Sequence, residues 1–422
     1  MARKVLISFL GTGPLETKDP NRTYKTANYH LGDTDLGKYP FVSAAMKKHY
    51  AIDKVLLVGT VHSMWEEVYR WYSLDKQMPI NDDIYLEIAE TCEKSNHTSP
   101  LSIPHKEAIE EALGKGSKVL LIKYGINEDE IKENINIILG LQQYLDEGDE
   151  LIVDVTHSFR SLPLFMMNLI VYLQNVSSKR IKISHIHYGM LEVIRELGYA
   201  PIIDLRSMLD VNDWITGAYA FSMFGNTYKI SSLLENENKA VAPILRNFSD
   251  AMNLNYLYPM QGEAQKLSGI ENKEYKTDLP KLIINPVVKD YVKTFKVKNP
   301  EHEQSFFQLK LADWQFKHKK YGQAYLTSND ALITYVCESN GLNWENKDNR
   351  EKAKLILRGK EQGTSVTPEM QEWFKQHNSR RNGIAHTTKL TKIINGKLKD
   401  LSVKEIINAL EEDIKDLKKM IK

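Results

Sequence analysis

Cysteine is nearly missing from this sequence of 422 residues, which contains only Cys92 and Cys337. Two cysteines so far apart exclude a disulfide framework and a cysteine-built metal site, and they are typical of a reducing compartment. Long apolar runs are missing too, because no stretch approaches the roughly 20 residues of a membrane span. The apolar run at residues 5–10 is too short for a signal peptide, and no small-residue cleavage site follows it. We therefore expect a soluble, cytoplasmic protein.

An excess of charge of either sign is also missing, since 56 Lys and Arg face 55 Asp and Glu and leave a formal net charge of +1. This balance excludes a globally basic coat for nucleic acid, so stable DNA binding is not expected, although a local basic groove stays open. Hydrophobic residues make up 42% and charged residues 26%, as in ordinary folded domains. At about 150 residues per domain, the length favours two to three domains.

The first half of the chain alternates short apolar runs with helical segments. The runs predict strands at residues 5–10, 54–59, 118–123, 150–155, 181–188 and 200–205, and the intervening periodicity predicts helices at 41–50, 128–145 and 161–174. Strands that are apolar throughout and separated by helices indicate a parallel sheet covered on both faces. We therefore predict a Rossmann-like α/β domain over residues 1–208, with ligands bound at the carboxyl ends of its strands.

The second half of the chain is helical in its periodicity. Residues 209–422 are therefore expected to form an all-α domain. Helices are expected at 231–252, 304–319, 321–339 and 402–421, and the last of these has the clearest apolar stripe. Residues 262–300 contain several Lys, Glu and Pro with little periodicity, which indicates an insertion or loop region.

Polar loops follow three of the predicted strands and form the first candidate site. Their residues of interest are Gly11, Thr12 and Gly13 after the first strand, Thr60, Ser63, Met64 and Trp65 after the second, and Thr156, His157, Ser158 and Arg160 after the fourth. Hydroxyl groups, an arginine and a helix N-terminus favour a phosphate-bearing ligand, with tight turns and N-caps as the structural alternative. The Gly11-x-Gly13 pattern lacks the third glycine of the dinucleotide fingerprint, so a nicotinamide site has little support.

The second candidate site is Arg381, Asn382 and His386. RNA cleavage without a metal needs a proton acceptor, a proton donor and a fixed cation for the charge that builds on phosphorus. Histidine as a residue type can exchange protons near neutral pH and so suits the first two roles, which we assign to His386. Arg381 presents a planar charged fork to phosphate, and Asn382 can orient either group. The structural alternative is a helix with a surface arginine and a core histidine.

Helix geometry complicates this second site. Residues five apart lie about 140° apart around an ideal helix, so Arg381 and His386 do not share a face. Either Gly383 bends the backbone, or a second subunit completes the site. Arg380 also precedes His386 and is an alternative to Arg381.

No cofactor or metal motif accompanies these sites. His185 and His187 share one face of a predicted strand, but no nearby Cys, Asp or Glu completes a ligand set. A Walker motif, His-Glu-x-x-His and paired cysteines are absent. We therefore expect neither a metal nor a bound cofactor.

The motifs together resemble a known family. The strand before Gly-Thr-Gly, the loop at 59–65, the stretch at 154–160 and the segment at 201–205 are similar to the CARF domain of CRISPR-associated proteins. Arg381-Asn382-x-x-x-His386 resembles the R-x(4–6)-H motif of HEPN ribonucleases. An α/β half followed by a helical half is the order found in the ancillary ribonucleases of type III CRISPR systems.

The resemblance implies an activity and its regulation. The CARF half would bind a cyclic oligoadenylate, the tetra-adenylate or the hexa-adenylate, across the two-fold axis of a homodimer, against the strand-end residues named above. The paired HEPN halves would bring two Arg381/His386 pairs into one groove, which would cleave single-stranded RNA to 2′,3′-cyclic phosphate ends in antiviral defence. Binding of the ring would activate cleavage allosterically. In some relatives the CARF half also degrades its activator, here a role for Thr156 and His157. The alternative is an inactive, ring-sensing regulator that binds RNA or a partner protein.

Overall fold

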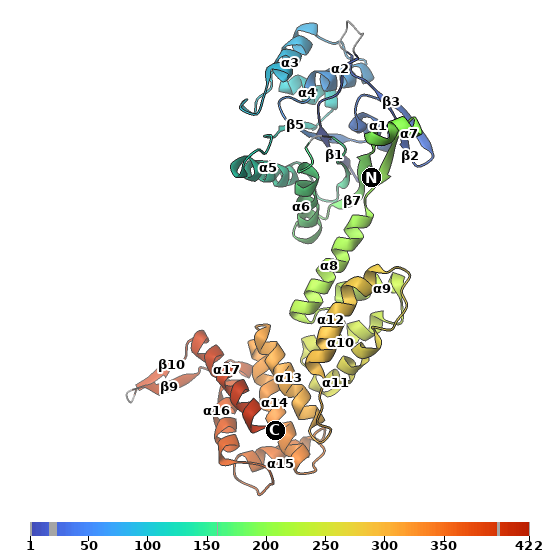
Figure 1. The fold of residues 1–422 in the computed structure, drawn as a ribbon. Coiled ribbons are helices and arrows are strands. Elements are labelled where there is room, and N and C mark those ends of the chain that lie inside the picture. The colour runs from blue at the N-terminus through green and yellow to red at the C-terminus, as the bar shows by residue number, and fades with distance from the viewer. Residues whose placement is uncertain (1, 17–22, 158, 395–396, 422) are drawn as a thin grey trace. The chain divides into compact units, whose positions relative to one another are not determined.

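The computed structural model describes residues 2–16, 23–157, 159–394 and 397–421 (Figure 1). The chain divides into two compact units, Met1–Asp210 and Val211–Lys422. Within the described ranges no helix is both long and apolar enough to cross a bilayer.

The first unit is built on an eight-stranded sheet with the order β3-β2-β8-β7-β6-β1-β4-β5. The strands are β1 (Lys4–Leu10), β2 (Ala27–Leu31), β3 (Thr34–Tyr39), β4 (Lys54–Gly59), β5 (Lys118–Leu121), β6 (Glu150–Asp154), β7 (Lys182–Gly189) and β8 (Ala200–Asp204). The five strands from β7 to β5 are parallel, whereas β8 runs antiparallel to β7 and β3 antiparallel to β2. The predicted Rossmann-like fold is therefore confirmed, but the sheet is mixed at one edge. The hairpin of β2 and β3 escaped prediction because its residues are polar and half-exposed rather than apolar.

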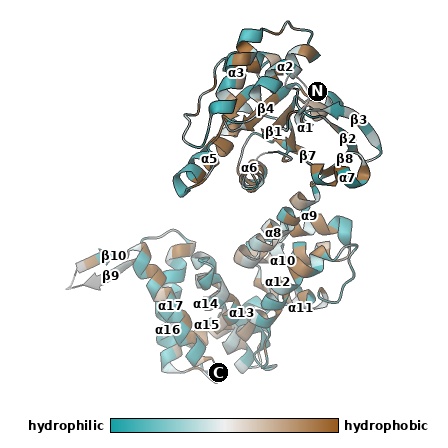
Figure 2. Ribbon diagram, turned by 45° about the horizontal axis from the view of Figure 1, so that its top comes forward, coloured by the Kyte–Doolittle hydropathy of each residue, from teal (hydrophilic) through white to brown (hydrophobic). Residues whose placement is uncertain are grey.

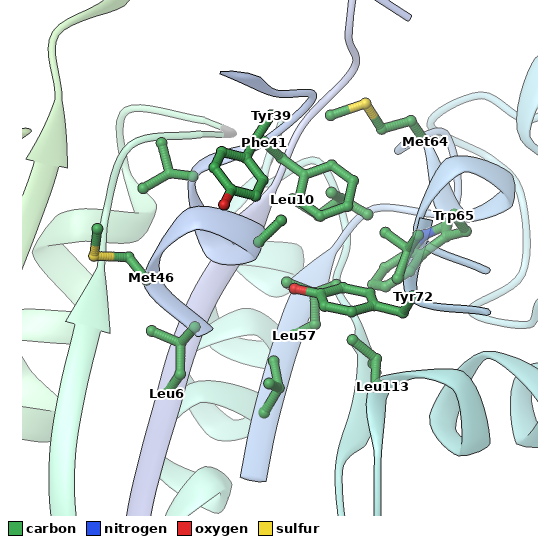
Figure 3. Close-up of a cluster of buried hydrophobic side chains, with 14 of the residues drawn as sticks. Leu6, Leu10, Tyr39, Phe41, Met46, Leu57, Met64, Trp65, Tyr72 and Leu113 are labelled. Carbon is green, nitrogen blue, oxygen red and sulfur yellow. The ribbon is translucent and has the colours of Figure 1, made fainter. Parts of the chain in front are cut away.

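Helices cover both faces of this sheet, and β1 shows how the sequence divides its side chains between them. Leu6 and Leu10 belong to one core cluster, which Figure 3 shows and which includes residues of α1, α2 and α4. Val5, Ile7 and Phe9 belong to a second cluster, which includes residues of α5 and α6. This alternation is the two-residue period of a strand buried on both sides. The helices are α1 (Val42–Tyr50), α2 (Trp65–Asp75), α3 (Asp82–Lys94), α4 (Lys106–Leu113), α5 (Glu128–Gly140), α6 (Leu162–Asn175) and α7 (Ile194–Leu197), with 3-10 turns at Leu141–Tyr144 and Leu191–Val193.

The second unit is helical and carries one small hairpin. Its helices are α8 (Ser207–Phe224, which begins in the first unit), α9 (Tyr228–Glu237), α10 (Ala242–Leu254), α11 (Leu257–Lys266), α12 (Leu279–Phe295), α13 (Glu303–Lys317), α14 (Tyr321–Ser339), α15 (Lys347–Leu357), α16 (Pro368–Ala385) and α17 (Val403–Met420), with a 3-10 turn at Leu267–Gly269. Hydrophilic and hydrophobic residues alternate along these helices (Figure 2), as expected where one face packs on a core and the other meets solvent. The hairpin consists of β9 (Thr391–Ile394) and β10 (Lys397–Asp400). The expectation of an all-α domain is therefore corrected by this hairpin.

The expectation of a loop over residues 262–300 is wrong for most of that segment. Helix α12 runs through it and buries Ile284, Val288, Tyr291 and Phe295, which recur at helical spacing. The pattern was obscured by two prolines. One of them stands in the first turn of α12, where proline is tolerated, and the other, Pro286, lies inside the helix.

Candidate functional site

The first candidate site lies where β1, β4, β6 and β7 end, and a buried carboxylate organises it. Asp154, the last residue of β6, is fully buried and accepts a hydrogen bond from Ser8 Oγ at 2.5 Å. The backbone N–H and the hydroxyl of Thr156 both donate to the other carboxylate oxygen, at 3.0 and 2.6 Å. Thr156 Oγ1 in turn accepts from the N–H of Gly189 at 2.7 Å. The predicted site residue Thr156 therefore joins the ends of β6 and β7, and its hydroxyl is engaged on both sides.

Gly189 was missed by sequence reasoning, although it closes β7. A Cβ built on it would lie 3.0 Å from Val42 Cγ2 and 3.3 Å from Thr156 Cγ2, so this close approach of β7 to α1 favours glycine. The start of α1 is thereby placed beside the end of β6. The sequence signal was a glycine directly after an apolar strand.

His157 is half-buried between these elements. Its Nε2 accepts from the backbone N–H of Val42 at 3.4 Å, which places the proton of the neutral ring on Nδ1. Burial lowers the pKa of His157, and the negative charge of Asp154 opposes that shift only partly. The ring is therefore neutral near pH 7. Arg160, by contrast, is exposed, and Ser158 lies outside the described residues.

The loop after β4 is arranged differently from the prediction. Ser63, Met64 and Trp65 are buried, as is Thr60, and Met64 and Trp65 join the core in Figure 3. Ser63 Oγ donates to the carbonyl of Leu10 at 2.8 Å, and Trp65 Nε1 donates to the carbonyl of Thr60 at 2.8 Å. These side chains fasten the end of β4 to the end of β1. They do not present groups to solvent in this conformation.

The loop after β1 is attached to the loop after β4. The N–H of Met64 donates to the carbonyl of Gly11 at 3.2 Å. A Cβ on Gly13 would lie 2.7 Å from the ring of Tyr24 and 2.8 Å from Met64 Sδ, so only glycine fits there without displacement. Thr12 is exposed between the two glycines. Of the residues predicted for this site, Thr12 and Arg160 are thus the freest to meet a ligand.

The second candidate site lies at the end of α16, where two adjacent arginines have different partners. Arg380 Nη2 donates to both oxygens of Asp413 on α17, at 2.7 and 2.9 Å. Arg381 Nη1 donates only to the Oδ1 of its neighbour Asn382, at 3.0 Å, and its Nε has no partner among the described residues. Arg380 is therefore part of the fold, which favours Arg381 as the functional arginine.

A buried histidine that sequence reasoning missed shares the same carboxylate. His377, fully buried, lies 2.6 Å from Asp413 Oδ2 through Nδ1, and its Nε2 lies 2.9 Å from Ser328 Oγ. The ring stacks on Trp373 with centroids 4.2 Å apart. The signal was a charged residue inside the apolar stripe of α17, since Asp413 lies between the buried Leu410 and Leu417.

His386 caps α16 and is exposed. Its N–H still donates to the carbonyl of Asn382 at 2.9 Å, so the helix is unbroken up to this residue. The idea that Gly383 bends the helix is therefore wrong. Gly383 instead provides space for Leu390, whose Cγ would be 2.8 Å from a Cβ at that position. Thr387 then takes a left-handed φ of 52°, which is strained for a β-branched residue.

Substituting Gly383 tests this packing. In Gly383→Ala the new methyl group must displace Leu390, and we expect a net stability loss of about 1 kcal/mol, because overpacking outweighs the gain in helix propensity. Gly262→Ala in α11 is the matched control, since a Cβ there meets nothing within 4 Å. We expect this control to raise stability by about 0.5–1 kcal/mol. Urea midpoints measure both, and equal shifts would contradict the close contact with Leu390.

Metal binding finds no support in the described residues, which contain no group of three or more His, Cys, Asp or Glu side chains able to hold an ion. The two histidines of β7 have other partners. His185 Nδ1 lies 2.8 Å from Asp204 Oδ2, and His187 Nε2 lies 2.8 Å from the hydroxyl of Tyr50.

Two family models match the chain, one in the first unit and one at the start of the second. Residues 5–192 match the family model of the CRISPR system endoribonuclease Csx1, CARF domain, and residues 210–301 match the second domain of the CRISPR-associated protein MJ1674. The chain is 37% identical over 367 residues to the CRISPR-associated protein MJ1674 of Methanocaldococcus jannaschii, an alignment that covers 84% of this chain and 57% of that protein. The chain thus spans little more than half the length of this relative.

A solved structure also aligns with the whole chain. It is Enterococcus italicus Csm6 bound to cyclic hexa-2′-fluoro-hexa-dAMP, with a TM-score of 0.40, 12% identity, and coverage of 100% of this chain and 94% of that one. The Csx1 CARF match includes the ends of β1, β4, β6 and β7, where the first candidate site lies. The Csx1 CARF match and the similarity to MJ1674 support a CARF-containing ancillary protein of CRISPR systems.

Proposed function

We propose that this protein is a metal-independent endoribonuclease of type III CRISPR antiviral defence, which cleaves single-stranded RNA when its CARF domain binds a cyclic oligoadenylate. The observation that carries the proposal is the end of α16, where His386 is exposed and Arg381 donates to its neighbour Asn382, while Asp413 engages Arg380. A Csx1-type CARF domain in the same chain supports a cyclic oligoadenylate as the activator.

The activator would bind at the strand ends of the first unit. Arg160 is exposed beside the start of α6, where the positive end of the helix dipole favours a phosphate. Backbone groups around Thr12 can approach the ring closely because two glycines flank it. His157 is neutral at physiological pH and offers its Nδ1–H as a donor. The tetra-adenylate is the first ring to test and the hexa-adenylate the second.

Cleavage would follow the in-line chemistry of metal-free ribonucleases. One His386 takes the proton of the 2′-hydroxyl, whose oxygen attacks phosphorus, and the P–O5′ bond breaks as a second His386 protonates the leaving oxygen. Arg381 stabilises the charge on the phosphorane. One chain holds a single His386, and Arg381 lies about 140° from it around the helix, so a homodimer supplies the second pair.

Exposed apolar side chains support the homodimer. Leu164 and Val171 are 68% and 37% exposed on α6, and Ile215 and Tyr219 are 53% and 59% exposed one turn apart on α8. Solvent-exposed leucine, isoleucine and valine at helical spacing favour burial against a second copy.

The test is cleavage of a fluorescent single-stranded RNA in EDTA, with and without cyclic tetra- or hexa-adenylate. We expect cleavage that depends on one ring, survives EDTA and leaves 2′,3′-cyclic phosphate ends. Arg160→Ala should weaken activation by raising the ring concentration needed, because it removes a charge-assisted phosphate contact. Ring binding without any cleavage would overturn the ribonuclease and favour a sensing regulator. Activator that stays intact after hours with the protein would exclude its degradation by the CARF domain.

A further inference from the structure

The hairpin of β9 and β10 follows the candidate catalytic histidine directly, since β9 begins five residues after His386. In Figure 1 it extends beyond the ends of α16 and α17 and covers no other helix. Leu398 is 74% exposed, so the hairpin buries little. A two-stranded ribbon on its own is only marginally stable in water, and this one adds little to a core.

The base of the hairpin is nevertheless firmly attached. Leu390 packs against Gly383 in α16, and its carbonyl accepts from the N–H of Leu401 at 2.9 Å. Lys392 forms an ion pair with Glu405, which also takes part in the capping box of α17. The hairpin therefore has a defined direction relative to the end of α16 and to His386.

The hairpin carries more positive than negative charge, and two of its lysines face each other across the strands. Residues 387–400 contain four lysines and one acidic residue, Asp400, which pairs with Lys389 at 3.0 Å. The register sets Lys399 directly opposite Lys392, and like charges in that position destabilise a ribbon. Glu405 neutralises Lys392, whereas exposed Lys399 has no ion pair in the described part of the chain. Lys397 precedes Lys399 by two positions in β10.

Lys399 therefore carries a charge that no ion pair in the described residues balances, and this points to an external counter-charge. We propose that the β9–β10 hairpin is an arm that contacts the phosphates of single-stranded RNA and holds the strand beside His386. This inference rests on the proposed ribonuclease function, because it takes its ligand from that site. Lysines bind phosphate without reading sequence, so the arm contributes affinity and salt dependence rather than base preference.

The experiment compares RNA binding by full-length chains that all carry His386→Ala to prevent cleavage. In Lys397→Ala/Lys399→Ala we expect several-fold weaker binding of a fluorescent RNA and a slope of log K against log salt that is smaller by about 1.4, or about 0.7 for each lost contact. Lys415→Ala/Lys419→Ala on α17 is the matched control. Both of its lysines are exposed and pair only within their own helix, with Glu411 and Asp416, and we expect the slope to stay unchanged.

A second variant separates charge from folding. Lys397→Arg/Lys399→Arg keeps the charge and should retain the affinity and the slope. An unchanged slope in the double alanine variant would overturn the proposal that the hairpin binds RNA. A loss of affinity that the double arginine variant does not restore would overturn it as well. In the cleaving protein, the alanine pair should raise KM and leave kcat nearly unchanged. Absence of ring-dependent cleavage in the wild type would overturn the proposed function separately, since the binding slope does not depend on cleavage.

Discussion

Replacement of His386 by alanine is expected to reduce ring-activated RNA cleavage by about 10²- to 10⁴-fold, the usual contribution of a positioned general acid or base. In a homodimer both proton transfers are lost together, which favours the upper end of that range. The side chain of His386 is exposed at the end of α16, so stability should change by less than about 0.5 kcal/mol. Initial cleavage rates measure the first effect and urea midpoints the second, and ring affinity shows whether the activator still binds.

The two arginines of α16 provide the matched control for this site. Arg381→Ala should reduce cleavage by about 10²- to 10³-fold and leave the urea midpoint nearly unchanged, because it removes a cation from the phosphorane and not from the core. Arg380→Ala should do the reverse, since it removes the arginine that pairs with the buried Asp413 and leaves His377 as its remaining side-chain partner in the described residues. If Arg380→Ala abolished cleavage in a folded protein while Arg381→Ala retained it, the assignment of the catalytic arginine would be wrong.

Asp413→Ala is expected to have the largest effect on stability of any single substitution near the site. The carboxylate accepts from Arg380 at 2.7 and 2.9 Å and lies 2.6 Å from His377 Nδ1, and all three groups are buried or nearly so. Removing one partner of a buried ion pair leaves the others without compensation and typically costs about 3–5 kcal/mol. Urea unfolding at fixed protein concentration measures the loss.

Glu412→Ala provides the control, because Glu412 carries the same charge in the same turn of α17 but is exposed. Its effect should remain within about 0.5 kcal/mol. Asp413→Asn should fall between the two, since the amide keeps one acceptor oxygen but loses the charge. Equal midpoints for Asp413→Ala and Glu412→Ala would show that the buried network contributes nothing to the fold.

The parts of the fold that could be predicted are those in which burial fixes the residue pattern. Strands β1, β4 and β6 are apolar on both faces because helices cover both faces of the sheet. Such continuous apolar runs predict a parallel sheet. The β2–β3 hairpin lies at one edge of the sheet, where β3 has a single neighbouring strand. Its side chains are partly exposed to solvent, so they need not be apolar. Helix α12 was not predicted for another reason. Pro286 has a low helix propensity, but the tertiary contacts of α12 keep the segment helical.

The candidate sites also contain features that the sequence predicts and features that depend on the tertiary structure. Arg381 and His386 were accessible from their types and spacing, but the choice between Arg381 and Arg380 depends on Asp413, which is 33 residues further along the chain. Side-chain direction was equally hidden in the loop after β4. Nothing in its composition tells whether Met64 and Trp65 face a ligand or the core, and in the structure the core contains both.

The position of Asp413 also has a consequence for biosynthesis. Arg380 and Asp413 are separated by 33 residues, and chains elongate at about 5–20 residues per second, so the partner of Arg380 is made about two to seven seconds later. During this interval α16 already contains Arg381 and His386, but His377 and Arg380 have no counter-charge with which to fix it against α17. A nascent chain therefore contains Arg381 and His386 before it contains the carboxylate that fixes α16 against α17.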